Sequence, residues 1–211
     1  MNIPISSFSN FQPQVPPGDS VSRMVCNQCN WIHYDNPRVI VTGLCTWQNQ
    51  VLLCRRAIAP RYGFWTLPGG FMETGETIEE GARREVREEA RAEVDVETLL
   101  ATYTVFRIGQ VHMIFHAAMG SSEFEAGPES LDVQLFPLTE ESIPWDDLAF
   151  PVNDWALRDF LSLSGEPPAQ PFTTRPEHRG QRMAQEPFHP DFPPPDTDRN
   201  PCGDQTTGEQ G

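Results

Sequence analysis

The stretch Gly70–Ala92, GFMETGETIEEGARREVREEARA, contains seven glutamates and four arginines. Thr77 and Glu80 have the spacing of a capping box, with threonine at the N-cap and glutamate at the third helical position. This pattern predicts a helix that starts at residue 78 and ends at residue 90 or 91.

Two glutamates of this helix border its apolar face. At about 100° per residue, small and apolar side chains form one stripe along the helix: Ile78, Ala82, Val86 and Ala90. Glu85 and Glu89 flank the stripe one turn apart, and Glu88 is next to them. Carboxylates crowded against a dry surface lose hydration and repel one another, so they either take up protons or bind a cation. Oxygen ligands with room for phosphate oxygens suit Mg²⁺ or Mn²⁺. The alternative is a solvated helix with ion pairs such as Glu80–Arg84 and Arg84–Glu88.

The same stretch resembles the Nudix box, in which a glycine is followed after five residues by glutamate and after seven more by Arg-Glu-apolar-any-Glu-Glu. The positions that agree in register are Gly70, Glu76, Arg84, Glu85, Val86, Glu88 and Glu89. Arg91 departs from the pattern, because the family has glycine there. Glycine suits a left-handed helix end, whereas arginine in that conformation costs about 1 kcal/mol, partly offset by its charge at the helix C-terminus.

This resemblance implies hydrolysis of a nucleoside diphosphate linked to another group. The implied metal ligands are Glu85, Glu88, Glu89 and the backbone carbonyl of Gly69. The implied structural residues, which hold the loop and the helix together, are Gly70, Glu76 and Arg84. Catalysis is assigned to Glu88 and Glu89 together with a general base, which the family often takes from outside the box. Glu129 is the candidate base, and Glu73 and Glu125 compete with it.

Stretches outside the box narrow the resemblance. NPRVIVTGL, LLCRR, GFWTLPGGFMETGE, GPESLDVQLFPL and IPWDDLAFPV are similar to Nudix hydrolases with a short N-terminal zinc ribbon, a group that includes plant FAD pyrophosphatases. The likeness implies that FAD is cleaved to FMN and AMP, with ADP-ribose or NADH as rival substrates. Tyr62, Phe64 and Trp65 either stack on a substrate ring or belong to the core, and the core is favoured for Phe64 and Trp65.

Cys26, Cys29 and His33 resemble the second knuckle of that zinc ribbon. A structural zinc site is closed by four ligands, yet the sequence upstream of Cys26 holds no cysteine or histidine. His33 is the candidate third ligand, and a fourth is not evident. Zn²⁺ binding therefore stays an alternative, and a degenerate ribbon remnant packed by Trp31 is favoured.

Strands mixed with helices indicate an α+β fold, and the resemblance specifies a Nudix-type α/β/α sandwich with a mixed central sheet and a short N-terminal ribbon remnant. The predicted strands are 38–47, 51–55, 99–106, 111–119 and 131–136, and a second helix is predicted over 151–163. The expected organisation is a flexible leader (1–21), a partial zinc-ribbon knuckle (22–36), a Nudix hydrolase domain (37–164) and a disordered tail (165–211), which holds ten of the 21 prolines.

The composition of the 211 residues excludes several functions. All 15 basic residues are arginines, so a Walker-type phosphate loop and Schiff-base chemistry, which both need lysine, are excluded. The formal net charge of −15 argues against nucleic acid or an anionic membrane as partner, but not against a small nucleotide held through a divalent metal. No apolar run is long enough to span a membrane and no secretory signal is recognised, so a cytoplasmic protein is expected. The resemblance is compatible with a homodimer.

Two other functions share the box. One is sanitising hydrolysis of free nucleoside triphosphates, against which the long match outside the box speaks. The other is a non-catalytic, Nudix-derived nucleotide-binding regulator, against which the full set of carboxylates speaks. The favoured interpretation is a Mg²⁺-dependent pyrophosphatase that acts on a dinucleotide such as FAD.

Overall fold

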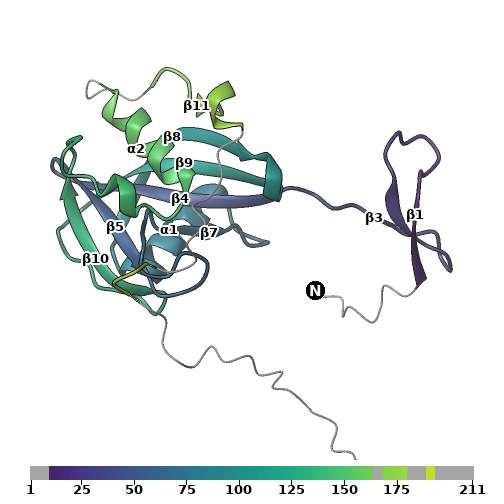
Figure 1. Ribbon diagram of the computed structural model, residues 1–211, viewed down its shortest axis with the longest axis horizontal. Coiled ribbons are helices and arrows are strands. Elements are labelled where there is room, and N and C mark those ends of the chain that lie inside the picture. Colours follow the sequence, from purple (N-terminus) through teal and green to yellow (C-terminus); the bar gives the residue numbers. More distant parts are fainter. Residues whose placement is uncertain (1–9, 164–167, 180–188, 193–211) are drawn as a thin grey trace, which may run out of the picture. The chain divides into compact units, whose positions relative to one another are not determined.

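The computed structural model describes residues 10–163, 168–179 and 189–192, and the chain divides into two compact units, residues 1–37 and 38–211 (Figure 1). The first unit is a three-stranded antiparallel sheet. Its strands are β1 (Phe11–Gln14), β2 (Arg23–Cys26) and β3 (Ile32–His33).

Strand β1 corrects the expectation of a flexible leader over residues 1–21. Phe11 is in register with Cys26, and its ring meets that of Trp31 edge-on with centroids 5.8 Å apart. Backbone pairing and this aromatic contact order residues whose composition suggested a linker. Residues 1–9 of the expected leader lie outside the described residues.

The second unit is built on a mixed sheet with the strand order β10-β5-β4-β9-β8-β11, to which β6 and β7 add by pairing with β5 and β4. The strands are β4 (Arg38–Trp47), β5 (Gln50–Arg56), β6 (Trp65–Thr66), β7 (Gly69–Phe71), β8 (Val94–Val105), β9 (Gln110–Met119), β10 (Ser130–Pro137) and β11 (Phe172–Thr173). The pairs β4–β9 and β8–β11 are parallel, and the other pairs are antiparallel. Short 3-10 helices also connect elements of this unit: η2 (Phe106–Ile108), η3 (Trp145–Asp147) and η4 (Pro176–His178).

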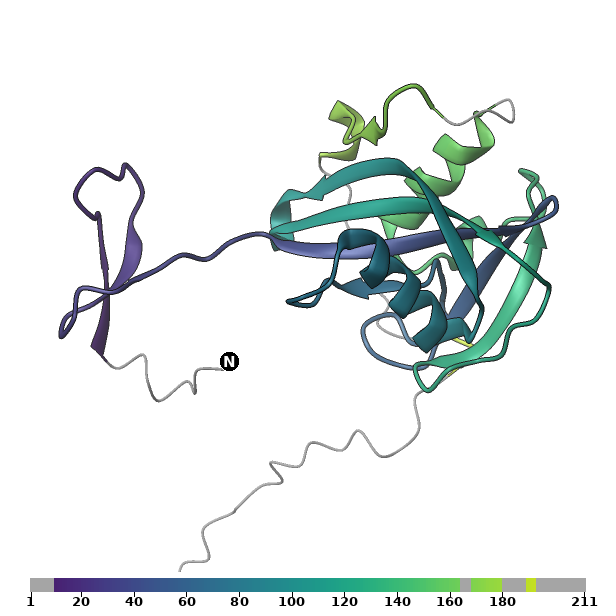
Figure 2. The ribbon, with the colours of Figure 1, turned by 180° about the vertical axis from the view of Figure 1, so that it is seen from behind.

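Two helices cover opposite faces of this sheet (Figures 1 and 2): α1 (Ile78–Ala90) and α2 (Pro151–Leu161). The alternation of side chains along β4 explains both layers, because neighbouring residues of a strand face opposite ways. Cys45 packs in the cluster that contains Val86 of α1, whereas Leu44 packs in the cluster that contains Leu157 of α2. Helix α1 approaches β4 closely, since a Cβ at Gly43 would lie 2.7 Å from the Cγ2 of Val86.

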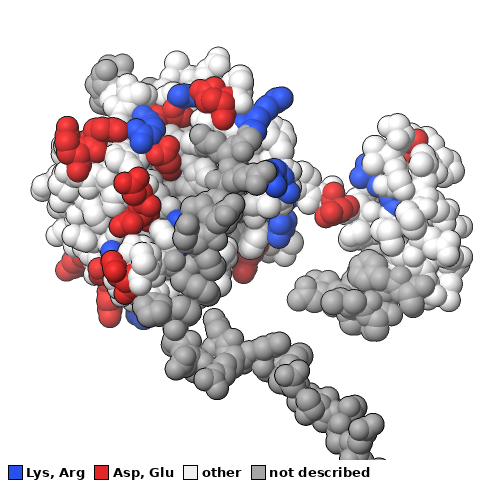
Figure 3. All heavy atoms as spheres, viewed as in Figure 1, with Lys and Arg blue, Asp and Glu red and all other residues white. Residues whose placement is uncertain are grey.

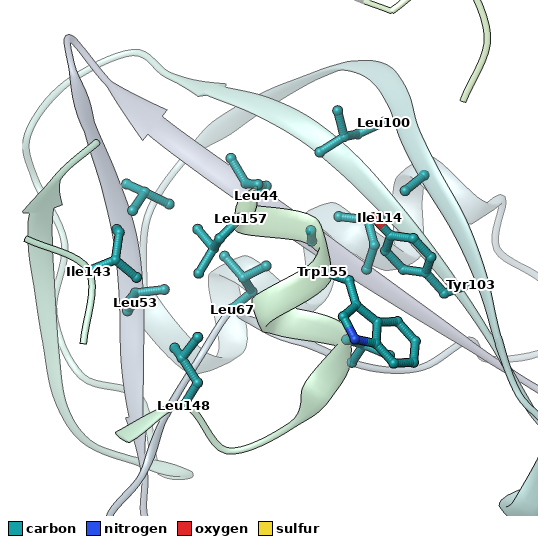
Figure 4. Close-up of a cluster of buried hydrophobic side chains, with 14 of the residues drawn as sticks. Leu44, Leu53, Leu67, Leu100, Tyr103, Ile114, Ile143, Leu148, Trp155 and Leu157 are labelled. Carbon is teal, nitrogen blue, oxygen red and sulfur yellow. The ribbon is translucent and has the colours of Figure 1, made fainter. Parts of the chain in front are cut away.

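The larger core cluster lies between the sheet and α2 (Figure 4). Leu44 and Ile114 enter it from the sheet, and Trp155 and Leu157 enter it from the helix. Proline at the first position of α2 suits a helix start, because its missing N–H needs no partner there. The α+β sandwich with a mixed sheet is thus confirmed, and the strands predicted from apolar runs are present with shifted ends. The short strands β6, β7 and β11 were not predicted.

The expectation of a disordered tail over residues 165–211 is wrong for its described parts. Phe172 pairs with Ala101 at the edge of the sheet, and the N–H of His189 donates to the carbonyl of Tyr62 at 2.8 Å. The remaining tail residues, 165–167, 180–188 and 193–211, lie outside the described residues.

On the face that Figure 3 shows, acidic side chains lie mostly over the left and centre of the larger unit, and several basic side chains lie along its right-hand margin. In the described part of the chain, neither helix has the length and apolar character needed to cross a bilayer.

Candidate active site

Helix α1 has the ends that its sequence specifies. The N–H of Glu80 donates to Oγ1 of Thr77 at 3.2 Å, and the N–H of Thr77 donates to Oε2 of Glu80 at 2.8 Å, so the capping box is complete. The helix ends at Arg91, which is left-handed with φ of 49°. Arginine therefore occupies the backbone conformation that favours glycine.

Glu85 and Glu89 line one cavity of about 1080 Å³. Glu85 is only 8% exposed and Glu89 only 7%, so both carboxylates are shielded from bulk water. Glu88 lines the same cavity from the exposed side of the helix. The helical spacing thus places three carboxylates of α1 along one cavity.

Burial makes ionisation of this pair costly. Loss of hydration, together with the negative charge of Glu85, raises the pKa of Glu89 to about 8. The N–H of Gly69, which donates to Oε2 of Glu89 at 3.2 Å, acts in the opposite direction and lowers the pKa. Burial also raises the pKa of Glu85, and Arg84 opposes that rise. Two carboxylates with raised pKa values beside each other form a site that favours an added cation.

Arg84 joins the loop before α1 to the helix. Its Nη2 and Nε donate to the two carboxylate oxygens of Glu76 at 2.8 and 3.0 Å, which lowers the pKa of Glu76 to about 2. Its Nη1 donates to Glu85 at 2.7 Å and to Glu88 at 3.2 Å, and Nη2 also reaches the carbonyl of Phe71 at 3.1 Å. One guanidinium therefore fixes the loop and partly neutralises the acidic cluster.

The glycines of β7 leave room for the carboxylates. A Cβ at Gly70 would lie 2.6 Å from both carboxylate oxygens of Glu85. A Cβ at Gly69 would lie 2.7 Å from the carbonyl oxygen of Val41. At Gly69 the gap is closed by backbone atoms of β4, so only glycine fits there, whereas a side chain at Gly70 would displace the Glu85 carboxylate.

The three candidate bases differ in their positions. Glu129 and Glu73 line the cavity, whereas Glu125 is not among its lining residues and pairs with Arg91 at 3.8 Å. The loop that carries Glu129 is fixed at the end of α1, because the N–H of Gly127 donates to the carbonyl of Glu89 at 2.9 Å. The carbonyl of Glu129 itself accepts from the N–H of Ala57 at 2.8 Å.

Sequence reasoning missed several cavity residues, above all Arg56. Its Nε donates to the carbonyl of Pro60 at 2.9 Å. Burial lowers its pKa, and the negative charges of Glu89 and Glu129 oppose that effect. A guanidinium facing two carboxylates across a cavity is suited to phosphate oxygens. The feature of the sequence that could have identified Arg56 is its position at the end of a predicted strand.

His112 also lines the cavity, and burial lowers its pKa to about 4, which keeps the ring uncharged.

The structure distinguishes the two alternatives for the aromatic candidates, substrate stacking and core packing. Tyr62, Phe64 and Trp65 are not among the residues that line the cavity. Phe64 and Trp65 are buried, as expected for core residues, with 5% and 3% exposed. The phenylalanine and tryptophan rings that line it are Phe71 of β7, Phe106 of η2, and Phe150 and Trp155 at the start of α2. These three places in the chain share no local sequence pattern.

The knuckle holds two free thiols, a buried Cys26 and an exposed Cys29. Hydrogen bonds from the backbone N–H groups of Gln28 and Cys29 lower the pKa of Cys26. His33 lies on β3 opposite Met24, with its ring 5.8 Å from that of Trp31. Within the described residues, no three His, Cys, Asp or Glu side chains are already grouped as metal ligands. The Cys and His side chains of residues 1–37 are only Cys26, Cys29 and His33, one fewer than a closed structural zinc site needs.

Comparison with known families agrees with this geometry. The family model described as NUDIX domain matches residues 36–156, and the zinc-ribbon model described as Nudix N-terminal matches residues 9–35. The chain belongs to the Nudix hydrolase family. In this family context, the N-terminal sheet is a zinc ribbon in fold, although its described residues lack a complete ligand set.

Known relatives share parts of this Nudix chain. An ADP-ribose pyrophosphatase from Methanocaldococcus jannaschii is 34% identical over 109 residues, which cover 50% of this chain and 64% of that protein. An NAD-capped RNA hydrolase NudC from Vibrio parahaemolyticus is 39% identical over 144 residues, 66% of this chain and 54% of that protein. The chain thus spans less than two thirds of either relative. The crystal structure of a NUDIX hydrolase from Nitrosomonas europaea is 44% identical, with a TM-score of 0.72, and covers 77% of this chain and 93% of its own.

Proposed function

We propose that this Nudix protein is a Mg²⁺- or Mn²⁺-dependent pyrophosphatase that hydrolyses ADP linked to a second moiety, with FAD, ADP-ribose and NADH as the candidate substrates. The observation that carries the proposal is the pair Glu85 and Glu89, buried in one cavity with raised pKa values. The relatives named for ADP-ribose and for NAD-capped RNA act on molecules of the same chemical kind.

The donor set around the cavity fits a hard divalent ion. Glu85, Glu88 and Glu89 offer carboxylate oxygens, and the carbonyl of Gly69 is the expected fourth donor. In the described part of the chain these side chains are not grouped as metal ligands, and Arg84 donates to Glu85 and Glu88. An ion bound at these oxygens would compete with the hydrogen bonds from Arg84. The bound ion supplies positive charge that offsets the charge of the phosphates during cleavage.

The remaining cavity residues suit the handling of the pyrophosphate group. Arg56 is placed to bind a phosphate oxygen, since it faces the acidic cluster and keeps its charge there. Glu129 is proposed as the general base on its fixed loop. Water attacks one phosphorus atom and gives its proton to the Glu129 carboxylate, while the bond from that phosphorus to the bridging oxygen breaks. Glu73 lines the same cavity and is the rival base.

The size of the cavity favours a substrate larger than a mononucleotide. Its volume of about 1080 Å³ is slightly above the usual range for small-molecule pockets. Free nucleoside triphosphates therefore rank below two-part substrates, and nucleotide binding without hydrolysis is the remaining alternative.

A substrate panel tests the proposal. The full chain is incubated with Mg²⁺ and, separately, FAD, ADP-ribose, NADH and dGTP, and the products are identified by mass spectrometry. We expect AMP and the matching phosphorylated second moiety from at least one of the first three compounds. Hydrolysis of dGTP alone would support the sanitising alternative. Tight nucleotide binding without phosphate release would support the regulator.

A further inference from the structure

Residues 172–179, which we call the strap, lie beyond the NUDIX domain match of residues 36–156. They are nevertheless bound to the domain. Phe172 and Thr173 form β11 and pair in parallel with Ala101 and Thr102 of β8 (Figure 1). The N–H of Thr104 donates to the hydroxyl of Thr174. The strap therefore extends the central sheet by one short strand.

An ion pair with a buried carboxylate anchors the strap to α2. Arg175 binds the carboxylate of Asp159 through Nη2, and Asp159 is only 2% exposed. The second oxygen of Asp159 accepts a hydrogen bond from the hydroxyl of Tyr103 at 2.6 Å. Because a buried carboxylate needs such partners, removing Arg175 leaves a charge that the interior cannot solvate.

The end of the strap forms part of the cavity wall. The ring of His178 stacks on that of Trp155 with centroids 4.0 Å apart and planes 4° apart, and both residues line the cavity. Figure 4 shows Trp155 beside Tyr103 at the margin of the core cluster. The guanidinium of Arg179 lies 5.2 Å from the ring centroid of Phe106, and both of these residues also line the cavity.

This part of the cavity wall differs in chemistry from the part formed by Glu85, Glu88 and Glu89. Phe106 is 57% exposed although it is a large apolar residue. Its cavity-lining neighbours on η2 are Arg107 and Ile108. Strand β4 gives a scale for the distance between this wall and the acidic one. Gln110, which follows η2, pairs with Arg38 of β4. Gly70, which lies beside Glu85, pairs with Val41, three residues further along β4. At about 3.3 Å per residue, these two positions are about 10 Å apart along the strand.

We propose that the strap completes the substrate site, and that Arg179 and Phe106 bind a heteroaromatic ring of the nucleotide while its pyrophosphate lies at the carboxylates. The inference rests on the proposed function for the position of the pyrophosphate. The exposed face of Phe106 offers a stacking surface. The guanidinium of Arg179 stacks on aromatic rings and donates to their acceptor atoms. His178 holds this end of the strap in place through Trp155.

Single substitutions in the full chain test the strap. We expect Arg179→Ala and Phe106→Ala each to raise KM for the preferred nucleotide about threefold to tenfold, as for loss of one stacking contact, with kcat little changed. The melting temperature of Arg179→Ala should equal that of the parent chain. The matched control is Arg87→Ala, which removes an exposed arginine that pairs with Glu93 away from the cavity and should leave KM unchanged.

A binding measurement separates this inference from the proposed function. Calorimetric titration with AMP should show weaker binding to Arg179→Ala, whereas titration with inorganic pyrophosphate should show no difference. If the parent chain hydrolyses none of the substrates, the proposed function fails while the AMP titration still tests the strap. Equal KM values and equal AMP affinities for the parent chain, Arg179→Ala and Phe106→Ala would overturn the inference.

The ion pair of Arg175 with Asp159 provides a second test, because it positions the strap. Arg175→Ala should release the strap and raise KM as Arg179→Ala does, and Arg175→Lys, which keeps a cation beside Asp159, should restore much of the affinity. If Arg175→Ala lowers stability without changing AMP affinity at a temperature where it is folded, the strap is only a structural element.

Discussion

The backbone N–H of Gly69 donates to Oε2 of Glu89 at 3.2 Å, and this contact joins β7 to the acidic face of α1. Gly69 is held against β4 by its pairing with Thr42. The carboxylate of Glu89 is therefore fixed by the sheet as well as by its own helix. A carboxylate held in place while buried suits an ion-binding role better than a role in surface solvation.

Replacing Glu89 with glutamine should abolish most turnover without unfolding the protein. Glu89→Gln keeps the size of the side chain and removes the charge that is costly to bury, so the melting temperature should not fall. Turnover should fall about 100-fold or more, as expected for loss of a metal ligand. Initial rates and thermal melts measure both effects. Glu79→Gln, at an exposed position of the same helix outside the cavity, is the control, and equal losses in both variants would remove Glu89 from the mechanism.

The stability of the metal-free protein should fall as the pH rises. The pKa of Glu89 is about 8 in the folded chain against an ordinary value of 4.5. Between these values the folded state retains a proton that the unfolded state has released, so a rising pH favours unfolding. Below 4.5 both states are protonated and this group adds no pH dependence.

Thermal melts in a chelator from about pH 5 to about pH 8 check this effect. The melting temperature of the parent chain should decrease over this range, that of Glu89→Gln should decrease less, and added Mg²⁺ should reduce the slope. A parent chain whose stability is flat or rises with pH relative to Glu89→Gln would contradict the burial of this carboxylate.

A methyl group at Gly70 should displace Glu85. The added Cβ of Gly70→Ala would lie 2.6 Å from both carboxylate oxygens, so the side chain must move. A shift of about 1 Å in a reacting site can cost about 100-fold in rate, and we expect a loss of this order with a folded protein. Gly120→Ala is the matched control, because nothing lies within 4 Å of its added Cβ. Comparable activity of the two variants would show that the Glu85 side chain can move without loss of activity.

Glycine at the end of α1 should stabilise the protein. Arg91 has φ of 49°, so Arg91→Gly should raise the free energy of unfolding by up to about 1 kcal/mol. Its exposed pair with Glu125, at 3.8 Å, contributes little. Arg87→Gly, inside the last helical turn, should instead lower the free energy of unfolding by about 1 kcal/mol. Denaturant titrations distinguish the two signs, and destabilisation by both variants would mean that the contacts of Arg91 outweigh its backbone strain.

The helix and its acidic face were predictable because their signals are local. The capping box of Thr77 and Glu80, and the 3.6-residue period that places Glu85 above Glu89, need only neighbouring residues. The strand β4 was equally evident from its β-branched run, and β9 from its apolar residues after the Ile108–Gln110 turn. Such patterns determine which side chains lie on one face of a helix or strand, and they were sufficient to predict the acidic residues of the site.

The other half of the cavity depends on contacts between distant residues. Asp159 meets Arg175 across a proline-rich stretch whose composition suggested disorder. Phe106 and Arg179 come together only because β11 adds to the edge of the sheet. The strand β1 was missed for the same reason, since its stability comes from pairing with β2 rather than from its own residues.

Binding of Mn²⁺, followed by electron paramagnetic resonance of the free ion, tests the central claim most directly. The parent chain and Glu79→Gln should bind Mn²⁺ with equal affinity, and Glu85→Gln and Glu89→Gln should each bind it at least about tenfold more weakly. If all four proteins bind Mn²⁺ alike, or none binds it, the buried carboxylates of α1 are not a divalent-metal site.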